Sequence, residues 1–301
     1  MGSIRWGLCC LFKEAPIKYR VAMATYMGKL KRSDQLAHLS QIIFSNLHAL
    51  EASIDYVALH GIGSFRITSQ LLPLYTQPTL GYQINELPEA ASVYDEFSRC
   101  KQSAKEKGIR LTFHPDQFVV LNSPHAHVVT NSIQELEYHG LLSELLGADV
   151  INIHAGGVYG NKRDALVRLT KEVENLSPEV RERLTLENDD KSYTPEDLYP
   201  VCKMLEIPLV YDVHHHRCNQ DGLSIEEASE LAYSTWNREP LFHISSPLEG
   251  WEGRKRERHH DYISFEDFPR CWLHMLPLTV EVEAKAKELA VLKIMQEVTH
   301  N

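Results

Sequence analysis

DVINIHAGG, residues 149–157, decides the fold, because an apolar run typical of a buried β-strand ends on His154 and two glycines follow. Five further runs have the same form and end on, or carry, a histidine or a carboxylate. They are IRLTFHP (109–115), RLTLEND (183–189), IPLVYDVHHH (207–216), PLFHISS (240–246) and LTVEVEAK (278–285). In a (β/α)8 barrel the carboxyl ends of the strands converge on one mouth, where active sites lie. The pattern therefore predicts that these side chains meet in one pocket.

Strands and helices are expected to alternate along the whole chain. The predicted strands are Arg5–Cys9, Ile62–Ile67, Ile109–Phe113, Val150–Ile153, Leu184–Leu186, Leu209–Tyr211, Leu241–Ile244 and Thr279–Val282. Segments between them repeat their apolar residues at about 3.6 residues, which indicates helices. This alternation is typical of a parallel sheet. We predict a single (β/α)8 TIM barrel with its site at the carboxyl ends of the strands.

Capping residues predict where several helices begin and end. The predicted starts are Ser33, Thr194 with Pro195, and Ser224 with Glu227; the predicted end is Gly108, for a helix from about Pro88; and a last helix is expected over EAKAKELAVLKIMQEV (283–298). No linker or composition break interrupts this pattern. We therefore expect residues 1–301 to form one domain.

Composition narrows the class of protein. Apolar residues make up 43% of the chain, enough for a sizeable core, and no apolar run approaches the ~20 residues that span a bilayer. The first ten residues lack the apolar segment of a signal peptide. The cysteines form no CxxC pattern, which excludes a zinc ribbon and indicates no disulfide framework; they are Cys9, Cys10, Cys100, Cys202, Cys218 and Cys271. A reducing, cytoplasmic setting is expected.

The net charge of −10 alone argues against a nucleic-acid partner. However, part of the acid lies in the expected pocket, where bound cations would offset it. One dense basic stretch, Arg254, Lys255, Arg256 and Arg258, precedes a candidate ligand. Two interpretations stay open for it: a solvated loop, or a loop that contacts phosphates.

The strand-end residues are of the types that bind metal ions. Imidazole and carboxylate together suit Zn²⁺, Mn²⁺ or iron. The candidates are His114, His154, Glu187, Asp212, His243 and Glu283, with His215 as the best placed of His214–His216 and with His259 and His260 equally placed. Each histidine alone is more often a core or turn residue, and Glu187 or Glu283 alone fits a surface turn or a helix start. Their shared position at strand ends favours a metal cluster. The GxGxxG, Walker and GxSxG patterns are absent.

The motifs FHPDQF, NIHAGGVYGNK, TLENDDKSYT, VYDVHHH, HISSP, RHHDYI and EAKAKE resemble in series those of the UV damage endonuclease family. That family resembles endonuclease IV, a TIM barrel with three metal ions. The resemblance implies a first metal on His114, His154 and Glu187, and a second on Glu187, Asp212, His243 and Glu283. A third would bind His215 and His259, since RHHDYI favours His259 over His260. It implies Mn²⁺, with Zn²⁺ or Mg²⁺ as alternatives, and catalytic roles for Glu187, His243 and Glu283.

The resemblance also implies the substrate and the reaction. Family members nick double-stranded DNA immediately 5′ of UV photoproducts by metal-dependent hydrolysis. Gln117 and Phe118 would fill the space left by flipped bases, and Arg254, Lys255 and Arg256 would contact phosphates. We expect a monomer without a membrane segment. An AP endonuclease, a xylose-isomerase-like isomerase or epimerase, and a metal-binding module without turnover are the alternatives.

Five residues depart from the family pattern, and one of them is Phe118, which replaces a tyrosine seen in some members. Gln77 stands where a histidine is common, and Leu241 where some members carry a lysine thought to be modified. Leu8 and Phe12 replace an aromatic residue and an asparagine that lie near the lesion. These departures affect the expected substrate range more than the reaction.

Overall fold

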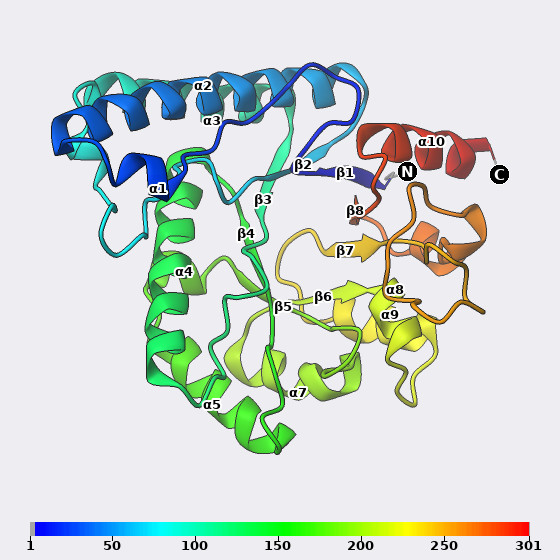
Figure 1. Ribbon diagram of the computed structural model, residues 1–301. Coiled ribbons are helices and arrows are strands. Elements are labelled where there is room, and N and C mark those ends of the chain that lie inside the picture. The colour runs from blue at the N-terminus through cyan, green and yellow to red at the C-terminus, as the bar shows by residue number, and fades with distance from the viewer. Residues whose placement is uncertain (1–3, 301) are drawn as a thin grey trace.

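Eight parallel strands close into one barrel in the computed structural model, which describes residues 4–300 (Figure 1). They are β1 (Arg5–Cys9), β2 (Ser64–Ile67), β3 (Arg110–Phe113), β4 (Val150–His154), β5 (Leu184–Glu187), β6 (Leu209–Asp212), β7 (Leu241–Ile244) and β8 (Thr279–Val282). The strands follow chain order, and β1 pairs with β8 to close the sheet. The predicted (β/α)8 barrel is confirmed, with every strand boundary within two residues of its prediction.

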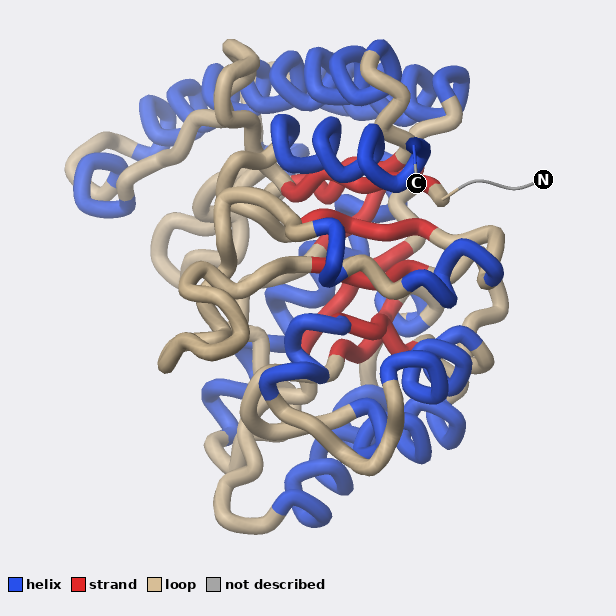
Figure 2. The backbone as a smooth tube through the Cα atoms, turned by 90° about the vertical axis from the view of Figure 1, so that its right-hand side faces the viewer, coloured by secondary structure: helices blue, strands red, loops and turns tan. Residues whose placement is uncertain are grey.

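Helices surround this sheet, as the tube view shows (Figure 2). They are α1 (Ala24–Met27), α2 (Arg32–Leu59), α3 (Ala90–Lys107), α4 (Ala126–Leu146), α5 (Lys162–Glu174), α6 (Pro178–Arg181), α7 (Pro195–Leu205), α8 (Val213–Cys218), α9 (Ile225–Tyr233) and α10 (Glu288–His300), with 3-10 turns η1 (Ile84–Glu86), η2 (Phe265–Asp267) and η3 (Arg270–His274). The long helices α2 and α3 pack side by side. Across residues 4–300, the helices are all too short or too polar to cross a membrane.

Three of the predicted helix ends are confirmed. Thr194 caps α7 and Ser224 caps α9, each in a reciprocal capping box with the residue three positions later. Gly108 ends α3 with a φ of 66°, a left-handed conformation that glycine adopts without strain.

Two helix starts were predicted wrongly. Ser33 lies inside α2, whose N-cap is Lys31. Arg32 is already helical, and its guanidinium donates to the carbonyls of Leu80 and Gly81, a tertiary contact that capping preference does not include. The last helix begins at Glu288 and not at Glu283, after Lys287 with a φ of 52°.

A glycine in β1 makes room for charge inside the barrel. Gly7 pairs with Glu281 of β8, and a Cβ on Gly7 would lie 2.7 Å from the Glu281 Cγ. Any larger residue at this position would displace the buried glutamate. The barrel interior below the mouth therefore holds ionised side chains as well as apolar ones.

Candidate metal centre

The strand ends bring the predicted residues to one place. Glu187 ends β5, Asp212 ends β6 and His154 ends β4, while His114 and Glu283 directly follow β3 and β8. His243 lies within β7, and Glu187, Asp212 and His243 are fully buried. Six strands that are far apart in the sequence thus each supply one side chain at the carboxyl end of the barrel.

Glu187 lies at the centre of four imidazoles. Its Oε2 is 3.0 Å from His114 Nε2 and 4.0 Å from His154 Nε2. Its Oε1 is 3.2 Å from His215 Nδ1 and 3.2 Å from His243 Nδ1. Each oxygen of one carboxylate therefore faces two histidines, an arrangement that suits a carboxylate shared between two cations.

The same neighbours keep Glu187 ionised. Burial would raise the pKa of the Glu187 carboxyl, but the surrounding imidazoles, His243 and His154 first and then His114 and His215, hold it well below its usual value. Asn152 also donates a hydrogen bond to Oε2. A buried carboxylate that stays charged needs cationic partners.

Glu283 gathers a second set of side chains on the other side of the centre. Its Oε1 lies 3.5 Å from His243 Nδ1, and its Oε2 lies 3.8 Å from His259 Nδ1. Burial would raise the pKa of Glu283, but Arg66 and His243 hold it well below its usual value. Glu283 thus adds a second ionised carboxylate to the pocket.

The donor atoms fit divalent metal ions. Three sets of side chains place their ligand atoms within 4.8 Å of one another; they are His114, His154 and Glu187; Glu187, Asp212 and His215; and His114, His243 and Glu283. Several of these atoms are buried without a hydrogen-bond partner among the described residues: Glu187 Oε1, Asp212 Oδ2, His154 Nδ1 and His243 Nδ1. Buried polar atoms are normally paired, and imidazole with carboxylate is a donor set for Zn²⁺, Mn²⁺ or iron.

The structure separates the residues within each histidine run. His215 Nδ1 lies 3.6 Å from Asp212 Oδ2 as well as beside Glu187. His216 points elsewhere, to Tyr211 and Asp221. His214 is fully buried against the Trp251 and His259 rings. Of the run, His215 is the residue that faces the proposed metal pocket.

His259 and His260 differ in the same way. His259 approaches Glu283, whereas Nδ1 of His260 contacts the backbone of Tyr262 at 3.0 and 3.1 Å. His259 belongs to none of the three close sets. It lies at the edge of the pocket and faces His215 with ring centroids 6.3 Å apart.

Sequence reasoning missed the buried ion pairs beneath these residues. Arg66 of β2 donates to Glu281 Oε2 and to Glu283 Oε1, both at 2.6 Å. Burial would raise the pKa of Glu281, but Arg66 and hydrogen bonds from His243 and Thr112 lower it to about 2. The available signals were an arginine inside the apolar run SFRI and the two-residue spacing of Glu281 and Glu283, which puts both on one face of the strand.

The predicted DNA-contacting residues lie on loops at the mouth. Gln117 and Phe118 follow β3 and are exposed, and 77% of the Phe118 surface is accessible. Arg254, Lys255 and Arg256 are exposed on the loop that follows β7. The structure thus places both groups where a large substrate could reach them.

Two of the five departures, Leu8 and Phe12, pack against neighbouring residues around β1. Leu8 is fully buried. Side chains alternate between the two faces of β1, and because Gly7 faces the barrel interior, Leu8 faces outward. Phe12 is half-buried, with its ring 5.9 Å from that of Phe65 and 5.1 Å from that of Tyr56. Both residues are part of the packing around β1.

Two further departures, Leu241 and Gln77, also contact neighbouring residues. Leu241, the first residue of β7, packs with Val150 and Val210 at the amino-terminal end of the barrel, where it cannot reach a metal pocket. Gln77 accepts hydrogen bonds from Thr79 and Leu80 within its own turn. The Gln77 side chain therefore stabilises the loop after β2.

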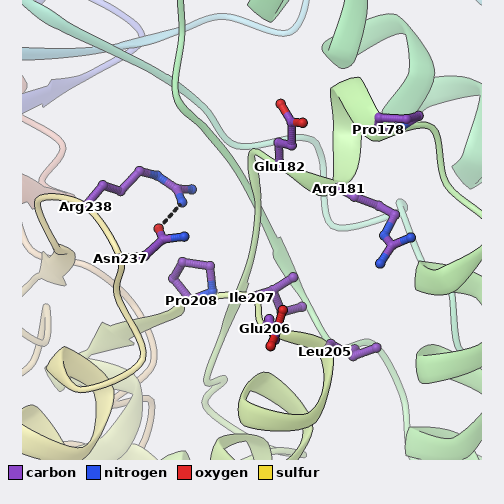
Figure 3. A pocket seen from close by; sticks show the side chains of 9 residues that line it. All are labelled: Pro178, Arg181, Glu182, Leu205, Glu206, Ile207, Pro208, Asn237 and Arg238. Carbon is purple, nitrogen blue, oxygen red and sulfur yellow. Dashed lines mark hydrogen bonds between the residues drawn. The ribbon is translucent and has the colours of Figure 1, made fainter.

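A pocket of about 610 Å³ lies at the opposite end of the barrel (Figure 3). Ile207 and Pro208 directly precede β6, and Asn237 and Arg238 precede β7. Arg238 donates a hydrogen bond to the Asn237 side chain at 3.0 Å. None of the candidate metal ligands lines this pocket, so it is separate from the site.

Comparison with known proteins identifies the family. The family model described as UV-endonuclease UvdE matches residues 4–301. A UV DNA damage endonuclease of Bacillus cereus (strain G9842) is 33% identical over 286 residues, which cover 91% of this chain and 86% of that protein. The chain belongs to the UvdE family. The resemblance that the sequence motifs predicted is confirmed.

Solved structures agree with the UvdE assignment. The crystal structure of SacUVDE superposes with a TM-score of 0.87 at 27% identity and covers 99% of both chains. Endonuclease IV from Thermus thermophilus gives a TM-score of 0.62 at 13% identity and covers 98% of both chains, which shows a shared barrel fold. The UvdE chain thus has the predicted relationship to the endonuclease IV fold.

Proposed function

We propose that this UvdE-family protein is a metal-dependent endonuclease that hydrolyses one strand of duplex DNA immediately 5′ of UV photoproducts. The observation that carries the proposal is the ionised Glu187 carboxylate, whose two oxygens each face two imidazoles at the mouth of the barrel. The names of the relatives support an endonuclease. They do not favour the sugar isomerase or AP endonuclease alternatives.

Three divalent ions would be held by eight residues. His114, His154 and Glu187 would bind the first; Glu187, Asp212, His243 and Glu283 the second; and His215 and His259 the third. Mn²⁺ is the proposed metal, with Zn²⁺ or Mg²⁺ as alternatives. When bound, such ions supply an activated nucleophile and offset charge on the phosphate. The proximity of His215 to Glu187 and Asp212 supports a third site that adjoins the second.

Side chains of the protein would position both the metal ions and the DNA. Glu187, His243 and Glu283 are the proposed catalytic residues: Glu187 would be shared by the first two metal sites, and His243 and Glu283 would bind the second. Exposed Gln117 and Phe118 would fill the gap left by a flipped lesion, and Arg254, Lys255 and Arg256 would contact phosphates. We further propose a monomeric, cytoplasmic, single-domain protein.

The test is a nicking assay on supercoiled plasmid with Mn²⁺. Irradiated plasmid should be nicked and untreated plasmid spared, and chelator should abolish the reaction. His243→Ala should reduce the rate by several orders of magnitude, because the metal supplies the nucleophile. His38→Ala, on helix α2, is the matched control and should keep full activity.

Three outcomes would contradict the proposal. Equal nicking of irradiated and untreated plasmid would remove the lesion specificity, and cleavage of an abasic duplex alone would favour an AP endonuclease. Absence of nicking by protein that contains two or fewer metal ions would favour the isomerase alternative.

A further inference from the structure

The proposed third metal site depends on two residues that lie outside the strands of the barrel. His215 lies in α8, a helix of six residues after β6. His259 lies in the loop between β7 and η2, which also carries the basic residues. Asp212, the last residue of β6, accepts a hydrogen bond from the His215 N–H at 2.8 Å, but the spacing of the two rings also depends on contacts between α8 and the loop.

Asp267, in the η2 turn, contacts both segments. It is buried, and its Oδ2 accepts a hydrogen bond from Ser246 Oγ at 2.5 Å. Its Oδ1 accepts from Trp251 Nε1 at 2.7 Å and from Arg217 Nη1 at 3.3 Å. One carboxylate therefore connects α8, through Arg217, with two points of the β7 loop.

On the loop side, the connection reaches His259 through the backbone. The carbonyl of Ser246 accepts a hydrogen bond from the His260 N–H at 2.8 Å, and Pro247 forms an antiparallel bridge with His259. The Leu248 N–H donates to the carbonyl of Arg258 at 2.6 Å. A shift of Ser246 would therefore move His259.

On the helix side, Arg217 is two residues from His215. The Arg217 guanidinium also lies 5.4 Å from the centre of the Trp251 ring, where a cation–π contact is favourable. Nη1 of Arg217 donates to the Asp267 carbonyl at 3.0 Å as well as to its side chain. The end of α8 is thus fixed against the same aspartate as the loop.

His214 and Trp251 fill the space between the two segments. The Trp251 ring centre is 5.3 Å from that of His214, which is 5.2 Å from that of His259. Neither nitrogen of the fully buried His214 ring has a hydrogen-bond partner among the described residues. Asp267 holds Trp251, Trp251 packs against His214, and His214 packs against His259. This series of contacts fixes the position of His214 beside His259.

We propose that Asp267 is a positioning residue that holds His215 and His259 at the spacing needed to bind a third divalent cation. This inference rests on the proposed metal centre. Carboxylates that orient metal ligands through hydrogen bonds commonly contribute roughly 10–100-fold to metal affinity. Asp267 acts on two ligands at once, through the loop and through the helix.

The experiment titrates metal-free protein with Mn²⁺ and counts bound ions by electron paramagnetic resonance and by elemental analysis. Asp267→Asn removes the charge that pairs with Arg217 and should weaken one site by roughly 10–100-fold while the others keep their affinity. Glu239→Gln is the matched control, because Glu239 is a half-buried carboxylate that pairs with Arg5 and Thr279 at the amino-terminal end of the barrel. It should bind the same number of ions as the wild type.

A second variant covers the case in which Asp267→Asn does not fold. Trp251→Phe keeps a ring against His214 but removes the N–H donated to Asp267, and it should weaken the same site. Unchanged number and affinity of Mn²⁺ ions in a folded variant would overturn the role of Asp267. If the wild type itself binds no divalent ion, the proposed metal centre fails instead.

Discussion

The Arg66 guanidinium lies 2.6 Å from Glu283 Oε1 and places a fixed positive charge beside a proposed metal ligand inside the barrel. Its Nε also donates to Glu281, and Nη2 lies 2.8 Å from His243 Nε2. Burying a charge is costly unless it is paired. Arg66 therefore stabilises two buried glutamates and holds one of them at the wall of the metal pocket.

Replacing Arg66 should destabilise the metal-free protein. Arg66→Met leaves Glu281 and Glu283 buried without their cation, and removal of one partner of a buried pair costs about 3–5 kcal/mol. The free energy of unfolding in urea with chelator should fall by that amount. Mn²⁺ should stabilise the variant more than the wild type, since it supplies positive charge beside Glu283. Arg110→Met, which breaks the pair with Asp149 at the other end of the barrel, should show no such rescue.

Removing the charge of Glu187 should lower the metal content. Glu187→Gln replaces a carboxylate that faces four imidazoles by a neutral amide, which is a poor bridge between two cations. Elemental analysis of protein purified without chelator should show at least one fewer divalent ion per chain than the wild type. Full metal content in this variant would contradict the shared site.

Buried His139 should make stability depend on pH. Burial lowers its pKa from 6.5 to about 4, since the protonated ring is disfavoured inside the protein. As the pH falls, the His139 ring is protonated in the unfolded chain before it is protonated in the folded protein. The contribution of neutral His139 to the free energy of unfolding is therefore complete above about pH 6.5 and is lost as the pH falls towards 4. It amounts to about 3 kcal/mol. His139→Gln should flatten this part of the pH profile of the unfolding free energy, and exposed His48→Gln should not.

The fold and the pocket were predictable because six of the eight predicted strands are apolar runs that end on, or carry, a histidine or a carboxylate. His154 and Glu187 could be placed without knowing what lies across the barrel. Arg66 could not, because its partner Glu281 is 215 residues away and no local pattern links them. The same holds for Asp267, which looks like an ordinary turn residue in the sequence.

Local backbone geometry explains where the Phe12 side chain lies. Phe12 lies three residues after the end of β1. Cys10 has a φ of 62°, and the chain turns so that the Phe12 ring packs on Phe65. A left-handed cysteine is uncommon and has no sequence signal, so this turn could not be predicted.

The basic loop should produce a salt-dependent affinity for DNA. Removing one phosphate-binding side chain should reduce the log–log salt slope by roughly 0.9. Arg258 already pairs with Glu249 at 3.7 Å, so Lys255 and Arg256 are the better test. Their double replacement by alanine should flatten the slope by nearly two units. Replacing Lys105 and Lys107, at the far end of α3, should leave it unchanged, and an unchanged slope in the first variant would return the stretch to a solvated loop.

Phe118 should contribute to the recognition of damaged DNA. Phe118 is 77% exposed, which contradicts packing beneath the loop and leaves the aromatic side chain accessible to stack on a base. Such stacking stabilises a complex by ~1–3 kcal/mol per base. Phe118→Ala should therefore weaken binding to an irradiated duplex by roughly ten- to hundredfold, with unchanged metal content and melting temperature. Met204→Ala is the control. Met204 is 62% exposed and lies near the end of α7, which leads towards the amino-terminal end of the barrel. If both variants bind damaged DNA like the wild type, Phe118 does not contact the lesion, and Gln117 becomes the residue to test.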